Sequence, residues 1–287
     1  MPLPRLLIIG AMKAGTTSLY MDIASHRESY LAQDKEPHSL CSDRVLTPEG
    51  RAEYALLYAG GSSQSLCCDA STGYAKLPDY EGVPERALQV LPDDFRVIYV
   101  VRNPLARIIS QHHHEHFQGL VGPSIDAEVR QHERYIRYSR YGYQLAPWLN
   151  AIGRDRVRVV SFERYVESRP ETLQGIFEFL GLPPDDAVIG SGKVYNRSQG
   201  KPVKNSYWRM VRDSRAYRQF IRPLTPLKFR LAVQHAILPK ATKSLAPPSP
   251  ETVAHIAAQL KDDLTLLSAQ LTPEEMASIR DSIEINQ

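Results

Sequence analysis

The chain has 287 residues, of which 43% are hydrophobic and 23% charged, with a formal net charge of +3. This composition is ordinary for a globular protein and gives room for one large α/β domain rather than two independent ones. The three cysteines exclude a disulfide framework, and the apolar residues 1–13 are too few for a membrane span and lack the pattern of a secretory signal. We therefore expect a cytoplasmic protein, unless an anchor has been removed from the chain.

The first half of the chain alternates between strand and helix patterns. Residues 5–10, RLLIIG, predict a fully buried strand of a parallel sheet, and a helix follows over residues 16–26. A weaker strand is predicted over Leu66–Ala70 and a short helix over Pro84–Leu91. Residues Phe95–Val101 give the strongest strand signal, because all of them except Arg96 are β-branched or aromatic.

The alternation continues to the end of the chain. A helix is predicted from Pro104 to about Phe117, a strand over Val157–Phe162 and a helix over Pro170–Leu180, which Gly181 ends. Apolar residues of Glu251–Leu271 share one helical face, and a last short helix follows. We predict an α/β, three-layer, P-loop-like fold with a central parallel sheet flanked by helices. Residues 1–287 form a single domain in this interpretation, with C-terminal helices in residues 250–287.

Residues 10–18 have the pattern of a phosphate-binding loop. They follow a buried strand and open a helix, where free N–H groups and the helix dipole favour an anion. We expect a phosphate to contact Lys13, Ala14, Gly15, Thr16, Thr17 and Ser18. The alternative is a glycine turn that only connects strand and helix.

The position of Lys13 separates this loop from the Walker A pattern, in which the lysine follows the second glycine. Here the lysine lies inside the loop, and Thr16 takes its usual place. A magnesium-bound β/γ-phosphate is therefore not the natural ligand, whereas Lys13 could neutralise charge on a leaving 5′-phosphate. A P-loop nucleotide kinase remains the alternative, although the strongest strand ends in Arg102 rather than in an acid.

Arg102 and Ser110 predict a second anion site. Arg102 follows the strongest strand, at the sheet edge where parallel α/β sheets bind ligands, and its guanidinium suits a phosphate bidentately. Ser110 lies two helical turns further on and can add a hydroxyl. Together with residues 10–18, the two residues predict a ligand with phosphates at two ends.

These motifs resemble those of the sulfotransferases that use 3′-phosphoadenosine-5′-phosphosulfate (PAPS), nearest the heparan sulfate branch and its bacterial relatives. LLIIGAMKAGTTSLY resembles the family's 5′-phosphosulfate motif, residues 98–116 resemble its 3′-phosphate motif, and residues 194–205 resemble a late loop over the nucleotide. The resemblance adds Lys201 and, more weakly, Arg197 to the donor contacts. It implies sulfuryl transfer to a hydroxyl or amine of a carbohydrate or other small metabolite, without a metal, releasing 3′-phosphoadenosine 5′-phosphate.

The resemblance also suggests a catalytic base. Asp34–His38 resembles the K-E-x-H/Q stretch of the heparan-type branch, in which the glutamate is the presumed base. We therefore predict Lys13, Glu36 and His38 as catalytic residues: Glu36 is the base, and His38 either orients the acceptor or substitutes for Glu36. The alternative is a surface loop of ordinary charged residues.

One departure concerns Ala70, which stands where the heparan-type branch has a catalytic lysine after an acid, here Asp69. It weakens any inference of a heparan-like acceptor. It also motivates a further alternative, a catalytically silent nucleotide-binding protein of the same fold. The acceptor pocket is expected in residues 40–65 and 119–143, where tyrosines such as Tyr138 suit sugar stacking but also pack cores.

Two further features concern partners. His112 and His116 share a helix face, but no carboxylate or cysteine cluster completes a metal site, so we expect one histidine of this helix to line the acceptor cleft and the rest to be exposed. Residues 196–246 contain twelve Lys or Arg and one acid. The basic and aromatic residues 207–222 could lie on an anionic membrane, close over the site as a lid, or form a partly buried helix. We expect no nucleic-acid partner, and the oligomeric state is left open.

Overall fold

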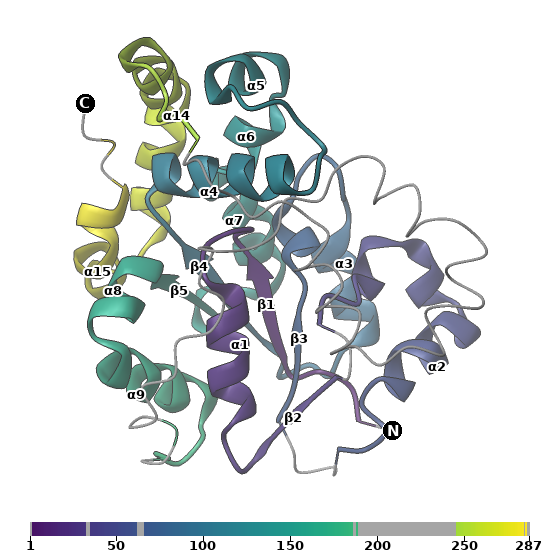
Figure 1. Ribbon diagram of the computed structural model, residues 1–287. Helices are drawn as coiled ribbons and strands as arrows, with labels where there is room; N and C mark the ends of the chain where they lie inside the picture. The colour runs from purple at the N-terminus through teal and green to yellow at the C-terminus, as the bar shows by residue number, and fades with distance from the viewer. Residues whose placement is uncertain are drawn as a thin grey trace, which may run out of the picture.

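The computed structural model describes residues 2–32, 35–61, 66–185, 188, 245–283 and 285. Its centre is a five-stranded sheet in the order β2-β3-β1-β4-β5, and every neighbouring pair is parallel (Figure 1). The strands are β1 (Leu6–Gly10), β2 (Ser29–Leu31), β3 (Leu66–Ala70), β4 (Arg96–Val101) and β5 (Val157–Ser161).

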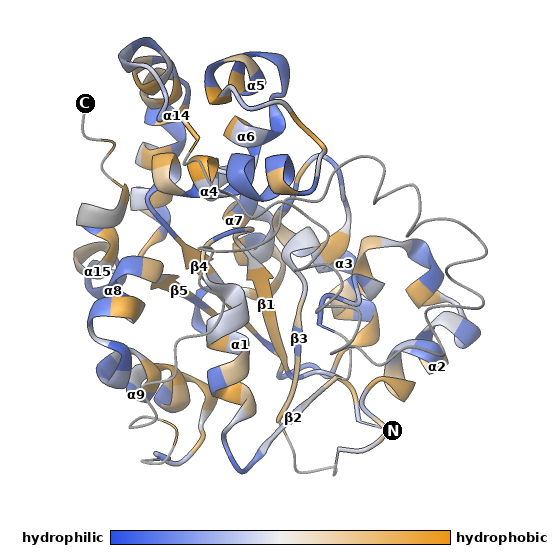
Figure 2. Cartoon of the chain, viewed as in Figure 1, coloured by the Kyte–Doolittle hydropathy of each residue, from blue (hydrophilic) through white to orange (hydrophobic). Residues whose placement is uncertain are grey.

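Within the described part of the chain, strands β1, β4 and β5 are strongly hydrophobic (Figure 2). All five residues of β1 are buried, and Leu6 pairs with Cys68 of β3 on one side and with Arg96 of β4 on the other. Because β1 lies in the middle, its side chains meet apolar neighbours on both faces, which explains the unbroken run LLII. The carboxyl ends of β1, β3 and β4 therefore meet at one edge of the sheet.

Helices flank the sheet, as the sequence predicts. Helix α1 packs against β1 and β3, whereas α7 passes behind the sheet in the view of Figure 1. The helices are α1 (Thr16–Ala24), α2 (Pro48–Leu56), α3 (Val83–Val90), α4 (Pro104–Phe117), α5 (Ile125–Gln131), α6 (Arg134–Arg137), α7 (Tyr141–Ile152), α8 (Phe162–Glu167), α9 (Arg169–Leu180), α14 (Pro250–Gln270) and α15 (Pro273–Ile283), with 3₁₀ turns η1 (Ser39–Cys41), η2 (Asp43–Leu46), η3 (Thr72–Ala75) and η4 (Arg154–Arg156).

The predicted fold class is confirmed: the structure is an α/β fold with a central parallel sheet. Each predicted strand is present, and each helix predicted with explicit limits begins and ends within two residues of them. The edge strand β2 and the helices α2 and α5–α8 are additions to the prediction. Residues 125–137, which we expected in an acceptor loop, are largely helical.

The C-terminal helices belong to the same core as the sheet. Leu267 of α14 and Ile279 of α15 are fully buried in the main apolar cluster. A second cluster joins Ile256 and Leu260 of α14 to Ile108 of α4. No helix in the described part of the chain is long and apolar enough to cross a membrane.

Candidate functional site

A cavity of about 440 Å³ opens among the loops that follow β1, β3, β4 and β5. This volume is in the range of small-molecule sites. The residues around it include most of those that the sequence predicts for the donor and the base. They are Met12, Lys13, Gly15, Thr16, Thr17, Ser18, Glu36, Thr72, Lys76, Arg102, Ser110, His114 and Phe162.

Gly15 sets the shape of the loop between β1 and α1. Its φ is 83°, in the left-handed region, and a Cβ there would lie 2.4 Å from the ring of Phe162. No other residue fits without moving that ring, so the loop turns tightly into α1, which begins at Thr16. Ala14 is the exception among the predicted contacts: its methyl group is buried, and its N–H donates to Ala11 O at 3.1 Å.

Arg102 joins the end of β4 to this loop. Its Nη1 donates to the Lys13 carbonyl oxygen at 3.0 Å, and its guanidinium lies 4.7 Å from the centre of the Phe162 ring. Burial lowers the pKa of Arg102, although nearby Glu163 opposes the shift. The Nε atom is buried and has no hydrogen-bond partner among the described residues. A cation in this condition can still donate hydrogen bonds to an anion.

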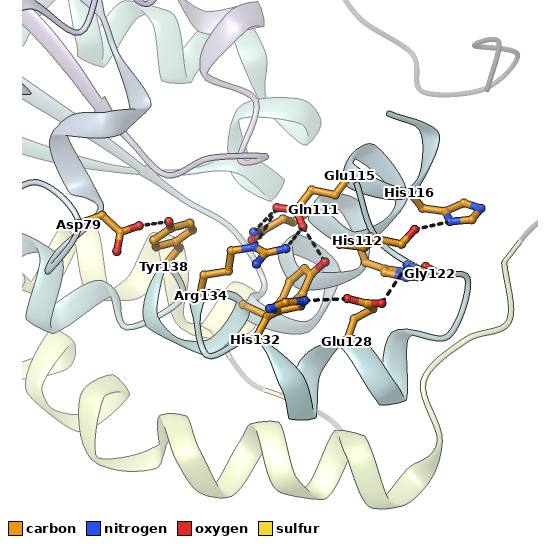
Figure 3. A network of polar contacts seen from close by, with 12 residues as sticks. Asp79, Gln111, His112, Glu115, His116, Gly122, Glu128, His132, Arg134 and Tyr138 are labelled. Carbon is orange, nitrogen blue, oxygen red and sulfur yellow. Dashed lines mark hydrogen bonds and ion pairs between the residues drawn. The ribbon is translucent and has the colours of Figure 1, made fainter. Parts of the chain in front are cut away.

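A buried polar network holds α4, the helix that brings Ser110 and His114 to the cavity. Arg107 is fully buried and donates to Gln111 at 2.8 Å, and Gln111 donates to Glu115 at 2.8 Å. Glu115 also accepts from Arg134 at 2.8 Å (Figure 3). These bonds tie α4 to α6 and fix the helix beside the loop of residues 10–18.

Glu36 projects into the cavity from the loop after β2. Its Oε1 accepts from Lys35 at 2.6 Å, and its Oε2 lies 3.5 Å from His38 Nε2 and accepts from Thr72 at 3.4 Å. Burial by itself would raise the pKa of Glu36, but the contacts with His38 and Lys35 outweigh it and lower the pKa to about 2. Glu36 is therefore ionised at neutral pH and can accept a proton.

Asp69 supports this side of the cavity from beneath. It is fully buried at the end of β3 and accepts hydrogen bonds from Tyr54, Ser71 and Tyr74, each at 2.7 Å. Ser71 Oγ in turn accepts from the His38 backbone N–H at 3.1 Å. Asp69 thus helps to position the segment that carries Glu36, although it does not line the cavity itself.

The structure brings in several residues that the sequence did not identify. Thr72 and Lys76 come from η3 and the residue that follows it, Phe162 from the start of α8, and Met12 from the loop between β1 and α1. Met12 lies within the motif of residues 10–18, at a position that the pattern does not single out. For Thr72, Lys76 and Phe162 only the packing of separate segments reveals the contact with the cavity. His38 contacts Glu36 but does not line the cavity.

The histidines of α4 divide between two surroundings. His114 lines the cavity. His112 is buried and its Nε2 lies 3.0 Å from the Gly122 carbonyl oxygen, while His116 Nδ1 lies 3.1 Å from that of Val121 (Figure 3). The expectation of an exposed His112 is therefore wrong, because the chain after α4 folds back over this face of the helix.

The tyrosines considered for sugar stacking or for core packing differ in their burial. Tyr135, Tyr138 and Tyr141 are buried, and Tyr141 donates to the Arg102 carbonyl oxygen at 2.7 Å. Tyr143 remains 45% exposed. These tyrosines serve mainly as core residues, and one of them fixes the backbone at Arg102.

The groups around the cavity fit phosphate and sulfate oxygens. One cavity is lined by residues with cationic or hydroxyl side chains, namely Lys13, Arg102, Thr16, Thr17, Ser18 and Ser110. Among the described residues, no group of three His, Cys, Asp or Glu side chains is arranged to hold a metal ion. The predicted contacts Arg197 and Lys201, the late loop 194–205 and the basic stretch 207–222 lie outside the described residues.

Comparisons with known proteins give a family match, sequence relatives and a structural neighbour. A family model described as the sulfotransferase family matches residues 28–186. Heparan sulfate glucosamine 3-O-sulfotransferase 6 from Mus musculus is 28% identical over 211 residues, covering 69% of this chain and 58% of that protein. The same enzyme from Homo sapiens has the same identity and coverage. The chain thus spans 58% of the length of these curated relatives.

A solved structure shares the fold. The crystal structure of a sulfotransferase from Alicyclobacillus acidocaldarius superposes with a TM-score of 0.63 at 19% identity, covering 94% of this chain and 96% of that one. At this level of identity the likeness concerns the arrangement of helices and strands.

Proposed function

The chain belongs to the sulfotransferase family, and from this premise we propose that it transfers a sulfuryl group from PAPS to a hydroxyl or amine. The acceptor is a carbohydrate or another small metabolite, and the second product is 3′-phosphoadenosine 5′-phosphate. The observation that carries the proposal is the meeting of Lys13, Arg102 and Glu36 around one cavity. The two cationic residues proposed to bind the phosphates of the donor thus line the same cavity as Glu36, the proposed base.

The proposed reaction divides the work between two sides of the cavity. The phosphate-binding loop holds the 5′-phosphosulfate, and Arg102 with Ser110 holds the 3′-phosphate. The acceptor oxygen or nitrogen attacks sulfur in line, the bond from sulfur to the 5′-phosphate oxygen breaks, and Glu36 takes the acceptor proton. Lys13 stabilises the negative charge that gathers on the leaving phosphate.

The acceptor is assigned by class only. The curated relatives act on glucosamine in heparan sulfate according to their names, and the chain has Ala70 where that branch has a lysine. A carbohydrate hydroxyl is therefore the first class to screen, followed by other small alcohols and amines. The three free cysteines, two of them buried, are compatible with the reducing cytoplasm that we propose as the location.

Calorimetry with 3′-phosphoadenosine 5′-phosphate tests the donor site. We expect the protein to bind this bisphosphate in the absence of magnesium and not to bind Mg·ATP. Lys13→Ala and Arg102→Ala should each weaken binding about 10- to 100-fold, because a hydrogen bond to a charged group is worth about 1.5–3 kcal/mol. Lys261→Ala, which removes an exposed lysine of α14, is the matched control. Binding of Mg·ATP without binding of the bisphosphate would favour a nucleotide kinase instead.

Mass spectrometry with isotope-labelled PAPS tests transfer. An acceptor library incubated with the protein should yield a sulfated product and 3′-phosphoadenosine 5′-phosphate. Glu36→Gln should lower the rate by about 10²–10⁴, the usual contribution of a general base, while the bisphosphate still binds. A protein that binds the donor product but transfers to no acceptor and does not hydrolyse PAPS would be catalytically silent.

A further inference from the structure

Lys76 is a cation of the cavity that the sequence motifs do not identify. It follows η3, at the end of the segment that leads away from β3, and lines the cavity together with Glu36 and Thr72. Its ammonium nitrogen lies 5.4 Å from the centre of the Tyr138 ring. The Tyr138 hydroxyl donates to Asp79, so the ring is held in place (Figure 3).

The charge of Lys76 is only partly compensated. Burial lowers its pKa, and the carboxylate of Glu36 opposes this shift. Cys41 and Asp79 also raise the pKa of Lys76, whereas Arg107 lowers it further. Among the described residues, its ammonium forms a contact with the Tyr138 ring but no ion pair. An anion placed in the cavity would stabilise a half-buried ammonium that has no ion pair.

The position of Lys76 differs from that of the other cations of the cavity. Lys13 belongs to the loop after β1 and Arg102 to the end of β4, whereas Lys76 comes from the segment after β3, on the opposite side of β1. Glu36 lies on this same side and follows β2. Ala70, at the end of β3, is 1% exposed and offers only a methyl group.

We propose that Lys76 is a further catalytic residue, whose ammonium binds the oxygens of the sulfuryl group as it passes from donor to acceptor. This inference rests on the proposed function. The acceptor oxygen forms a bond to sulfur, and the bond from sulfur to the 5′-phosphate oxygen breaks with its electron pair remaining on the phosphate. The acceptor proton goes to Glu36. Lys76 keeps its own proton throughout and contributes charge alone.

The surroundings favour this role over a purely structural one. A positive charge has a larger effect on developing negative charge in a half-buried cavity than in water. Lys13 is placed to act on the leaving phosphate, and Lys76 approaches from the side of the base. In this proposal the Lys13 ammonium stabilises the leaving phosphate, and the Lys76 ammonium stabilises the oxygens of the sulfuryl group.

The test compares Lys76→Met, Lys76→Arg and the control Lys261→Met. Turnover of labelled PAPS is followed by mass spectrometry, as transfer to the acceptor found by screening or as hydrolysis to sulfate. We expect Lys76→Met to lower kcat about 10²–10³-fold, the usual loss for one such stabilising group. The Kd for 3′-phosphoadenosine 5′-phosphate should stay within about threefold, because this product lacks the sulfuryl oxygens. The kcat of Lys76→Arg should be at least about tenfold higher than that of Lys76→Met. The kcat of Lys261→Met should equal that of the wild type.

The outcomes separate the two proposals. If the wild type turns over PAPS and Lys76→Met retains kcat within about threefold, the role of Lys76 is overturned while the proposed function stands. Loss of bisphosphate binding with unchanged kcat would make Lys76 a donor contact and would also overturn it. If the wild type neither binds the bisphosphate nor turns over PAPS, the proposed function itself fails.

A second measurement keeps the test decisive if Lys76→Met folds poorly. The kcat of the wild type should fall as pH rises through the lowered pKa of Lys76, because deprotonation removes the charge. The kcat of Lys76→Arg should not fall over this pH range, since arginine remains protonated. A melting temperature equal to that of the wild type would show that this variant is folded normally. The same alkaline fall in both proteins would contradict the proposal.

Discussion

Lys13, Glu36 and His38 have left-handed backbones, with φ of 69°, 64° and 55°. This conformation costs a residue with a Cβ about 1–2 kcal/mol, so surrounding contacts must hold it. For His38 one such contact is the hydrogen bond from its N–H to Ser71, which Asp69 supports. Among the described residues these are the three non-glycine positions with positive φ. Strain therefore gathers at the residues that the motifs assign to catalysis.

His38→Ala should raise the pKa of Glu36 from about 2 toward its ordinary value of 4.5, because it removes the strongest group that lowers it. A depressed carboxyl pKa stabilises the fold above the unfolded-state pKa, and this stabilisation is lost as pH falls from about 4.5 toward 2. The variant should therefore lose stability near pH 7 and little near pH 2. Carbon-13 NMR titration, with Glu36→Gln to assign the signal, measures the pKa directly. An unchanged pKa would contradict the role of His38.

Two residues show where sequence-based inference about the site ends. Glu36 could be identified because a local motif, K-E-x-H, marks it. Lys76 could not, because its neighbours in the sequence are unremarkable. Its contact with Tyr138 and its electrostatic interaction with Glu36 join segments far apart along the chain. Only the tertiary structure brings these groups together.

At the scale of elements, the turn η3 packs against the segment that carries Glu36, the proposed base. A Cβ on Gly73 would lie 2.6 Å from His38 Nδ1 and 2.9 Å from Cys41 Sγ. Gly73→Ala should therefore displace His38, raise the pKa of Glu36 and lower kcat about tenfold, since a displacement of this size costs catalytic alignment. Turnover of PAPS and the NMR titration of Glu36 measure the two effects.

Gly175→Ala in α9 is the matched control, because a Cβ at this position would meet no neighbouring atom within 4 Å. The substitution should stabilise the protein by about 0.4–1 kcal/mol and leave turnover unchanged. If Gly73→Ala behaved in the same way, η3 would have no influence on His38.

The elements that the sequence predicts well have strong local patterns. Strand β1 and all of β4 after Arg96 are apolar runs, and α14 has an apolar stripe over 21 residues. The strand β2 has three residues, too few for a pattern, and is defined by pairing with β3. Helices α5 and α6 are short and rich in charge, so tertiary packing rather than local preference decides their structure.

At the scale of the whole molecule, the core extends beyond the family match. The matched region ends at residue 186, whereas Asp263 of α14 accepts from the N–H groups of Gly142 at 3.0 Å and Tyr143 at 2.8 Å. These bonds satisfy free donors in the first turn of α7. The helix that supplies Asp263 thus supports the helix behind the sheet, and we expect residues 245–283 to fold together with the matched region.

Leu260→Ala tests this cooperation. Leu260 is fully buried against Ile108 of α4 in the second apolar cluster, so its truncation should lower the free energy of unfolding by about 2–5 kcal/mol. Leu266, on the same helix, is 43% exposed, and Leu266→Ala should change stability by less than about 0.5 kcal/mol. Urea unfolding should be followed by circular dichroism and by the fluorescence of Trp148, which is buried in the main cluster.

In a Trp208→Phe background, which leaves Trp148 as the remaining tryptophan, the two probes should report one coincident transition. Leu260→Ala should shift both transitions to lower urea by the same amount, because the clusters around α4 and around the sheet unfold as one unit. A variant in which circular dichroism shifts while Trp148 fluorescence does not would show that α14 unfolds separately. The chain would then contain a sheet domain that is stable without its C-terminal helices.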